Sequence, residues 1–373
     1  MSLPLLLLVL HGMPTLDETW NRTFQRRLLA WYRKHRRELP WRDNADPYRV
    51  WLSEIMLQQT QVATVIAYFE RFVAAFPTVK ELAAAEEQQV LRLWEGLGYY
   101  RRARQLHLAA KQIVELHAGR FPRDIEAVRS LPGIGRYTAG AITSIAFGAR
   151  QPILEANTIR LFSRLVAYRE DVSKAAGQRR LWEVAAAILP QKHVGDFNQA
   201  LMELGAKVCT PRNPGCDVCP VAELCAAKQA GSQGEIPLLR KPLKFEEVHE
   251  AAVVVHRRGK ILLCQYQEGG RWAGLWDFPR FSLVKRKGAA RDAELVAKVA
   301  DMTGVTISPT GQIATLKHGV TRFRITLHCH GADFVSTRKS KVNLPLMQWL
   351  SLDDLPAIPL NTTGRRLSEL IGK

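Results

Sequence analysis

The sequence has few cysteines and no long apolar run. Six cysteines in 373 residues are too few for a disulfide scaffold, so we expect a reducing, cytoplasmic setting. The longest apolar run, Leu3–Leu10, is far shorter than the ~20 residues that a membrane-spanning helix needs. No basic residue precedes it and no small-residue cleavage site follows it, which argues against a signal peptide. We therefore expect no membrane segment, and either a frayed N-terminus or a start at Met13.

Acidic residues are scarce relative to basic ones. Lys and Arg number 53 against 35 Asp and Glu, which gives a formal net charge of +18 at pH 7. The excess is equal in residues 1–230 and 231–373, so it is not a detachable tail. Such a charge favours polyanionic partners, either nucleic acid or an anionic surface. The hydrophobic content of 47% excludes a mainly disordered chain.

Alternating strand patterns are almost absent from residues 20–230, which we predict to be an all-α domain. Apolar spacing predicts a helix over Trp51–Phe76, ended by Pro77. Two further helices are predicted over Glu81–Trp94 and Arg101–His117.

The pattern changes after residue 230. Residues 231–244 are rich in Gly, Pro and Lys and are predicted to be a linker. Residues 245–373 are predicted to form an α+β domain. Their β-branched runs Glu250–His256 and Lys260–Tyr266 indicate a hairpin, and Ala289–Met302 has the pattern of a helix.

The segment Leu131–Gly135 (LPGIG) is a tight turn that contains Gly133 and Gly135 and precedes a predicted helix. Backbone N–H groups at such a turn suit a phosphate. The two glycines alone favour a plain helix connection, whereas the basic charge of the protein and the residue pattern that follows the turn favour the phosphate. The basic run Arg101–Arg104 fits phosphate contacts or a solvated helix face.

Four cysteines are gathered within residues 209–225, with six, two and five residues between successive members. They are Cys209, Cys216, Cys219 and Cys225. Four thiolates so close together predict a closed metal site. The spacing alone leaves both Zn²⁺ and an iron–sulfur cluster open.

Several motifs together resemble a known superfamily. Residues 131–142 (LPGIGRYTAGAI) and 154–164 (LEANTIRLFSR) resemble the helix–hairpin–helix glycosylases of DNA repair. Residues 47–72, 96–104 and 197–209 are similar to the MutY family, which removes adenine opposite 8-oxoguanine. The resemblance implies a two-lobed helical domain with a base pocket between the lobes, and a [4Fe–4S] cluster on the four cysteines. It implies double-stranded DNA with A:8-oxoguanine or A:G mispairs as the partner of a monomeric, nucleoid-associated protein.

Cleavage of the bond between adenine and deoxyribose needs an acid for the departing base and an anion beside the sugar cation. The resemblance implies Glu54 as the acid, Glu155 as the anion and Asn157 beside the reacting centre. From the residues alone, either glutamate also fits the first turn or the N-cap of a helix. The family has Asp-Gly-Asn where this chain has Glu155-Ala156-Asn157. A misplacement of about 1 Å can cost on the order of 10²-fold in rate, so we expect reduced or altered activity unless the backbone compensates.

Tyr137 occupies the position that carries a nucleophilic lysine in the bifunctional lyases of this superfamily. A phenol forms no Schiff base, so the resemblance implies a monofunctional glycosylase. It also implies that Gln59 and Tyr99 insert into the duplex and that Arg42 and Gln199 line the base pocket.

Residues 245–373 resemble the MutT-like (Nudix) C-terminal domain of the same family, most clearly in Arg271–Pro279 (RWAGLWDFP). Hydrolysis of nucleoside diphosphates is excluded, because the stretch that should carry the metal-binding carboxylates, Arg291–Val305, has only Asp292, Glu294 and Asp301. The family reads 8-oxoguanine through a short loop, which corresponds here to His318–Arg322. His318 and Thr321 match that loop and its neighbours depart from it, so lesion discrimination is expected to differ.

Two alternatives remain at the level of the sequence. One is a thymine or uracil mismatch glycosylase on the same scaffold. The other is a protein that binds the lesion without catalysis, because Glu155 replaces the aspartate of the family.

Overall fold

The computed structural model describes residues 16–238, 244–267, 269–270, 272–338 and 345–372. The apolar run Leu3–Leu10, Met13 and part of the expected linker lie outside the described residues. The chain divides into two compact units, Met1–Lys80 with Leu108–Lys241 and Glu81–His107 with Pro242–Lys373. Within the described ranges, no helix is both long enough and apolar enough to cross a bilayer.

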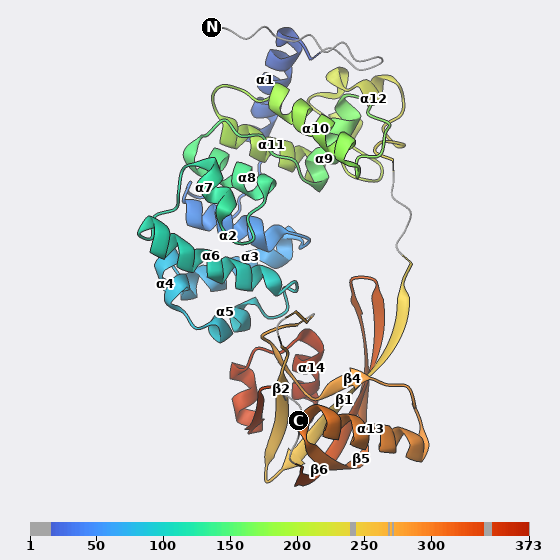
Figure 1. Ribbon diagram of the computed structural model, residues 1–373. Helices are drawn as coiled ribbons and strands as arrows, with labels where there is room; N and C mark the ends of the chain where they lie inside the picture. The colour runs from blue at the N-terminus through green and yellow to red at the C-terminus, as the bar shows by residue number, and fades with distance from the viewer. Residues whose placement is uncertain (1–15, 239–243, 268, 271, 339–344, 373) are drawn as a thin grey trace. The chain divides into compact units, whose positions relative to one another are not determined.

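The described chain is helical as far as residue 229, as predicted (Figure 1). The helices are α1 (Glu18–His35), α2 (Pro47–Leu57), α3 (Val62–Ala75), α4 (Val79–Ala84), α5 (Glu87–Trp94), α6 (Arg101–His117), α7 (Ile125–Ser130), α8 (Arg136–Phe147), α9 (Ala156–Leu165), α10 (Ala175–Ala187), α11 (Val194–Lys207), η1 (Cys216–Val218), η2 (Ala222–Leu224) and α12 (Ala226–Gln229).

The prediction of one continuous helix over Trp51–Phe76 is wrong. The chain leaves α2 at Leu57, passes through Gln59 with φ of 57°, and enters α3 at Val62. The apolar spacing stays in phase across this break, so periodicity alone could not reveal it. The Glu81–Trp94 prediction is likewise divided, into α4 and α5.

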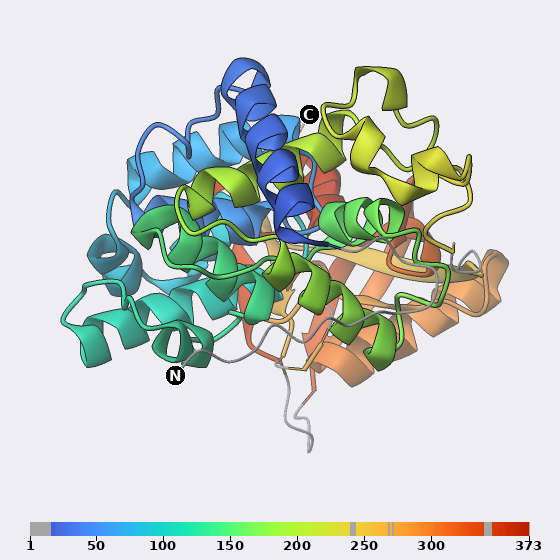
Figure 2. The ribbon, with the colours of Figure 1, turned by 90° about the horizontal axis from the view of Figure 1, so that it is seen from above.

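Helix α1 packs in the first unit against the much later α11 (Figure 2). Phe24 and Leu28 of α1 are fully buried in one core with Phe197 and Leu201 of α11. This core also takes in α9 and α10, so it fixes the start of α9 relative to α11.

The predicted glycine turn joins α7 to α8 as a helical hairpin. Gly133 has φ of 78°, a conformation that favours glycine, and Gly135 is the N-cap of α8 with φ of −91°. Both glycines are exposed, so the backbone at the start of α8 is open to solvent.

The second unit contains a mixed sheet in the order β3-β2-β1-β6-β5, with β4 paired to β1 and β7 paired to β2. Strand β1 runs parallel to β6 and antiparallel to β2. The elements are β1 (Glu246–Arg257), β2 (Lys260–Gln265), β3 (Trp276–Asp277), β4 (Arg280–Ser282), α13 (Gly288–Thr303), β5 (Val305–Val320), β6 (Phe323–Thr337), β7 (Met347–Leu350), η3 (Leu352–Ala357) and α14 (Thr362–Ile371).

Strand β1 buries both of its faces. Val253 and Val255 pack with Leu295 of α13, whereas Val254 packs with Leu367 of α14 on the opposite side. A sheet covered on both faces by helices confirms the expected α+β class, and the predicted β1–β2 hairpin is present.

Candidate active site

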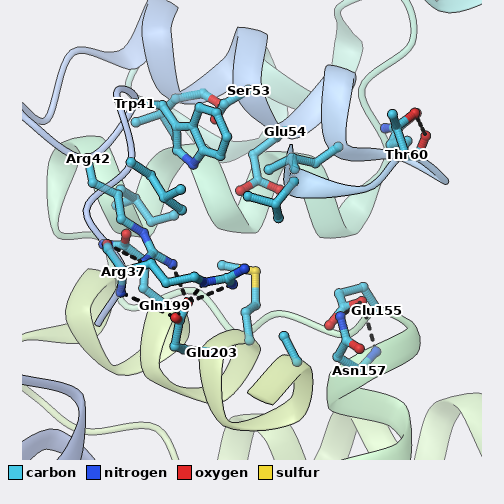
Figure 3. A pocket seen from close by; sticks show the side chains of 18 of the residues that line it. Arg37, Trp41, Arg42, Ser53, Glu54, Thr60, Glu155, Asn157, Gln199 and Glu203 are labelled. Atoms are coloured by element: carbon cyan, nitrogen blue, oxygen red, sulfur yellow. Dashed lines mark hydrogen bonds and ion pairs between the residues drawn. The ribbon is translucent and has the colours of Figure 1, made fainter. Parts of the chain in front are cut away.

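A cavity of about 440 Å³ lies in the first unit among α2, α8, α9 and α11 (Figure 3). Glu54, Tyr137, Glu155, Asn157 and Gln199 all line it, so the structure brings together residues that the sequence predicted from four separate segments. The volume lies in the range of ~300–1,000 Å³ that is typical of small-molecule pockets.

Glu54 lies on α2 with 7% of its surface exposed. Burial raises its pKa from 4.5 to about 7, against the hydrogen bond from Tyr137, and the charge of Glu155 adds to the rise. The Tyr137 hydroxyl donates to Glu54 Oε2 at 2.5 Å. Glu54 can therefore hold a proton near neutral pH and release it inside the cavity.

Tyr137 acts in this cavity as a neutral hydrogen-bond donor. Burial raises its pKa well above the ordinary value, and the charges of Glu54 and Glu155 add to the effect. No lysine is among the described residues that line the cavity, so this wall offers no amine nucleophile.

Glu155 is the N-cap of α9, and its backbone is extended with φ of −140°. Its side chain accepts hydrogen bonds from the backbone N–H groups of Asn157 at 2.8 Å and Thr158 at 3.0 Å. Burial raises the pKa of Glu155, against these two hydrogen bonds and the charge of Arg160. The N-cap role and the place in the cavity are thus both present, and the longer side chain folds back onto the start of its own helix.

Asn157 is held by residues that the sequence analysis missed. Its Oδ1 accepts from Arg160 Nη2 at 2.9 Å, and Arg160 also donates to the carbonyl oxygens of Gly205 and Cys209, both at 2.7 Å. A Cβ on Gly205 would lie 2.7 Å from Asn157 Cβ, so glycine is required for this approach of α11 to α9. Arg160, within the motif 154–164, was the available sequence signal.

A buried ion cluster forms another part of the cavity wall, as the dashed lines in Figure 3 show. Glu203 is fully buried and accepts from Arg37 Nε at 2.7 Å and from Arg42 Nη2 at 2.9 Å. Burial acts to raise the pKa of Glu203, but the two arginines outweigh it and the pKa is lowered. Arg42 was predicted, whereas Arg37 and Glu203 were missed; Glu203 is the only acid within 197–207, four residues after Gln199.

The two residues expected to insert into DNA lie in different units. Gln59 is exposed and lines the cavity from the left-handed turn after α2. Tyr99 belongs to the other unit. Arg102, expected in a phosphate-binding run, instead donates to the Gly98 carbonyl at 3.2 Å and lies over the Tyr99 ring.

The segment expected to be a lesion-reading loop is the end of a β-hairpin. His318 is in β5, and Thr321 is exposed in the turn to β6 with φ of 52°. The Thr321 hydroxyl donates to the neighbouring Val320 carbonyl at 2.7 Å. His318 stacks on Trp272 with ring centroids 6.4 Å apart, and its Nε2 lies 3.3 Å from Arg280 Nη2.

The carboxylates of α13 are engaged in structural contacts. Glu294 accepts from the backbone N–H groups of Val284 and Lys285, and Asp292 pairs with Arg291. Among the described residues, no three His, Cys, Asp or Glu side chains converge to hold a single metal ion. The exclusion of a hydrolase centre on α13 stays a prediction from the sequence.

The four clustered cysteines line one small cavity beside α9, and none is in a disulfide. Burial raises the pKa of Cys219 to about 12, with the neighbouring thiols adding to the rise, so this thiol needs a bound cation to ionise near neutral pH. Arg164 Nη1 donates to Cys209 Sγ at 3.3 Å. Four thiols around one cavity fit a closed, four-ligand metal site.

Family models match three segments of the chain. Residues 52–187 match the HhH-GPD superfamily of base excision DNA repair proteins, and residues 209–225 match the iron–sulfur binding domain of endonuclease III. Residues 250–370 match the NUDIX domain. Together with the helical hairpin and the buried acid, these matches define a base excision repair protein of the helix–hairpin–helix class.

Proteins with similar sequences define the family within this class. The chain is 34% identical to an adenine DNA glycosylase of Rattus norvegicus over 92% of this chain and 77% of the relative. It is 37% identical to an adenine DNA glycosylase of Buchnera aphidicola over 69% of this chain and 75% of the relative. A solved thermostable thymine-DNA glycosylase superposes with a TM-score of 0.51 at 28% identity, covering 57% of this chain and 98% of its own. The chain belongs to the adenine DNA glycosylase family, and the match over residues 209–225, the segment that contains the four clustered cysteines, shows that it holds a [4Fe–4S] cluster.

Proposed function

We propose that this chain excises adenine paired with 8-oxoguanine, or with guanine, from double-stranded DNA. The observation that carries the proposal is the shared cavity, lined by both Glu54 and Glu155, in which the pKa of Glu54 is raised to about 7. A proton donor and a second carboxylate in one pocket are the pair that glycosidic cleavage requires.

The proposed reaction begins when adenine leaves the base stack and enters the cavity. Glu54 gives its proton to a ring nitrogen of adenine, and the electrons of the C1′–N9 bond leave with the base. The Glu155 carboxylate stabilises the resulting sugar cation. A water then adds its hydroxyl to C1′ and returns a proton to Glu54, which leaves an abasic site. Asn157 donates to Glu155 through its Nδ2 at 3.3 Å and orients it.

Tyr137 supports a monofunctional reaction without strand cleavage by the enzyme. Its phenol donates to Glu54 and stays neutral, so it positions the acid and shields the sugar instead of attacking it.

The rest of the proposed DNA interface uses the helical hairpin, two turns and the cavity wall. The N–H groups of the hairpin at Gly133 and Gly135 bind phosphate, and Gln59 and Tyr99 insert into the duplex. Arg42 and Gln199 face the extruded base. We assign catalysis to residues 20–230 and the opposite base to residues 245–373, joined by 231–244.

On the lesion side, His318 and Thr321 contact the 8-oxoguanine. The exposed turn position of Thr321 and the stacking of His318 on Trp272 support this assignment. The [4Fe–4S] cluster cross-links residues 209–225 and takes no part in the hydrolysis, which moves no net electrons. We further propose that the protein acts as a monomer.

Single-turnover excision tests the proposal, with A:8-oxoguanine and T:G duplexes and alkali treatment to reveal abasic sites. The protein should cleave the adenine strand and leave T:G intact. Glu155→Asp should keep the N-cap and the anion, whereas Glu155→Gln should lose about 10²-fold in rate. Excision of thymine instead of adenine would favour the mismatch glycosylase, and tight binding without abasic sites would favour a lesion-binding protein. An undiminished rate in Glu155→Gln would overturn the role of that carboxylate.

A further inference from the structure

Helix α5 presents one face to the C-terminal part of its own unit (Figure 1). Gln88 and Glu95 are seven residues apart, and Leu91 lies between them at helical spacing, so the three share a face. Gln88 Nε2 donates to the Gly274 carbonyl at 3.0 Å, and Gln88 Oε1 accepts from Trp276 Nε1 at 3.0 Å. Both partners belong to the segment that resembles the 8-oxoguanine-reading domain.

Gly274 allows this approach. It has φ of 85°, and a Cβ on it would lie 3.1 Å from Leu91 Cδ1 and 3.2 Å from Glu87 Oε1. The loop before β3 therefore packs directly on α5, and a Cβ at this position would require Leu91 and Glu87 to shift by a few tenths of an ångström.

The strongest contact is a bidentate ion pair at the end of α5. Arg365 of α14 donates from Nε to Glu95 Oε1 at 2.6 Å and from Nη2 to Glu95 Oε2 at 3.0 Å. The two side chains are only 17% and 7% exposed. Glu95 also accepts from the backbone N–H of Leu360 at 3.2 Å. Two planar groups joined in this way fix orientation as well as distance.

Glu95 is also the residue from which the Tyr99 turn starts. Gly96, Gly98 and Tyr99 all have positive φ, of 92°, 76° and 50°. Trp94 Nε1 donates to the Gly98 carbonyl at 3.1 Å, which ties the turn back to the last residue of α5. The Tyr99 side chain is 50% exposed at the tip.

We propose that Glu95 and Arg365 are positioning residues that hold the Tyr99 turn in register with the domain that reads the base opposite adenine. Tyr99 and the lesion-reading hairpin then approach the duplex as one body, so recognition of 8-oxoguanine sets where the tyrosine inserts. This inference rests on the proposed function. It assigns to Glu95 and Arg365 a contribution to the preference for 8-oxoguanine over guanine.

The test uses the full-length protein with Glu95→Gln, Arg365→Met and both together, and Arg365→Lys as the conservative variant. The control is Glu235→Gln, which breaks a largely exposed ion pair with Arg169. Single-turnover rates are measured on A:8-oxoguanine and A:G duplexes, and amide hydrogen exchange is followed at residues 96–104 without DNA.

We expect each single variant to lower the A:8-oxoguanine to A:G rate ratio about tenfold or more and to accelerate exchange at 96–104, but not at 47–57. The double variant should lower the rate ratio no further than either single variant does. Arg365→Lys should keep a higher ratio than Arg365→Met. Unchanged exchange at 96–104, or faster exchange with an unchanged ratio, would overturn the proposal. The exchange result stands even if the wild-type protein excises no adenine, so failure of the proposed function remains distinguishable.

Discussion

Two buried carboxyl groups in one cavity have pKa values that are shifted in opposite directions. Glu54 and Glu203 both line the cavity and are both shielded from water. The pKa of Glu54 is raised to about 7, whereas the pKa of Glu203 is lowered. Burial acts in the same direction on both, so their neighbours make the difference.

Glu54 has a phenol as its hydrogen-bond partner and a second carboxylate, Glu155, nearby. Glu203 is bound directly by two guanidinium groups, from Arg37 and Arg42. A neutral donor compensates little of the cost of desolvating a charge, and two cations compensate all of it. The cavity thus holds one carboxyl that can deliver a proton and one that stays an anion.

The largest effect is expected when the proton donor is removed. Glu54→Gln keeps the shape of the side chain but cannot protonate a leaving base, so single-turnover excision should fall by about 10²–10⁴-fold. Binding of the uncleaved A:8-oxoguanine duplex should stay within a few-fold of wild type, which a filter or anisotropy assay measures. A rate within tenfold of wild type would show that Glu54 is not the acid.

Glu203→Gln should act on stability. It leaves two arginines without their anion in a buried site, which costs about 3–5 kcal/mol in the free energy of unfolding. Denaturant titration at pH 7 measures the loss. Because the pKa of Glu203 is lowered, its stabilisation is present above its ordinary pKa and is lost as the pH falls below it. A Glu203→Gln protein as stable as wild type would mean that the arginines find other partners.

Glu54→Gln should raise the free energy of unfolding, whereas Glu203→Gln should lower it. A raised pKa means that the native state binds more protons than the unfolded state, so Glu54 destabilises the protein as the pH rises from 4.5 towards about 7. Removing the charge should therefore stabilise the protein at pH 8 by up to roughly 3 kcal/mol and change little at pH 5. Thermal unfolding at both values checks this, and equal shifts at both would contradict it.

Much of this arrangement was predictable from the sequence. The motifs around Glu54, Tyr137 and Glu155 are local, so the resemblance located each, and the structure brings them to one cavity. The helical hairpin at Gly133 and the α+β pattern were likewise visible in the local sequence.

Other features depend on tertiary contacts. Glu203 looks like an ordinary helix residue until Arg37, far away in the chain, is placed against it. The break after Leu57 preserves the apolar phase, so no periodicity could indicate it. The grouping of residues 81–107 with the C-terminal part of the chain depends on pairs such as Glu95 with Arg365, which carry no signal in either local sequence.

A smaller effect is expected when the Tyr137 hydroxyl, the hydrogen-bond partner of Glu54, is removed. The hydrogen bond from Tyr137 lowers the pKa of Glu54, so Tyr137→Phe should raise that pKa further. The midpoint of the pH–rate profile for excision should then move upward by about one unit or less. Tyr137→Phe with a midpoint moved downward would contradict the hydrogen-bond assignment.

The pH dependence of single-turnover adenine excision by the wild-type protein tests the protonated state of Glu54 most directly. On the acidic side, excision should fall where Glu155 becomes protonated, because its anion is needed. Above a midpoint near 7, excision should fall about tenfold per pH unit, because only the protonated carboxyl of Glu54 can donate. Glu54→Gln should give a low rate without this limb. A wild-type rate that stays flat from pH 6 to pH 9, or that rises with pH, would contradict the account.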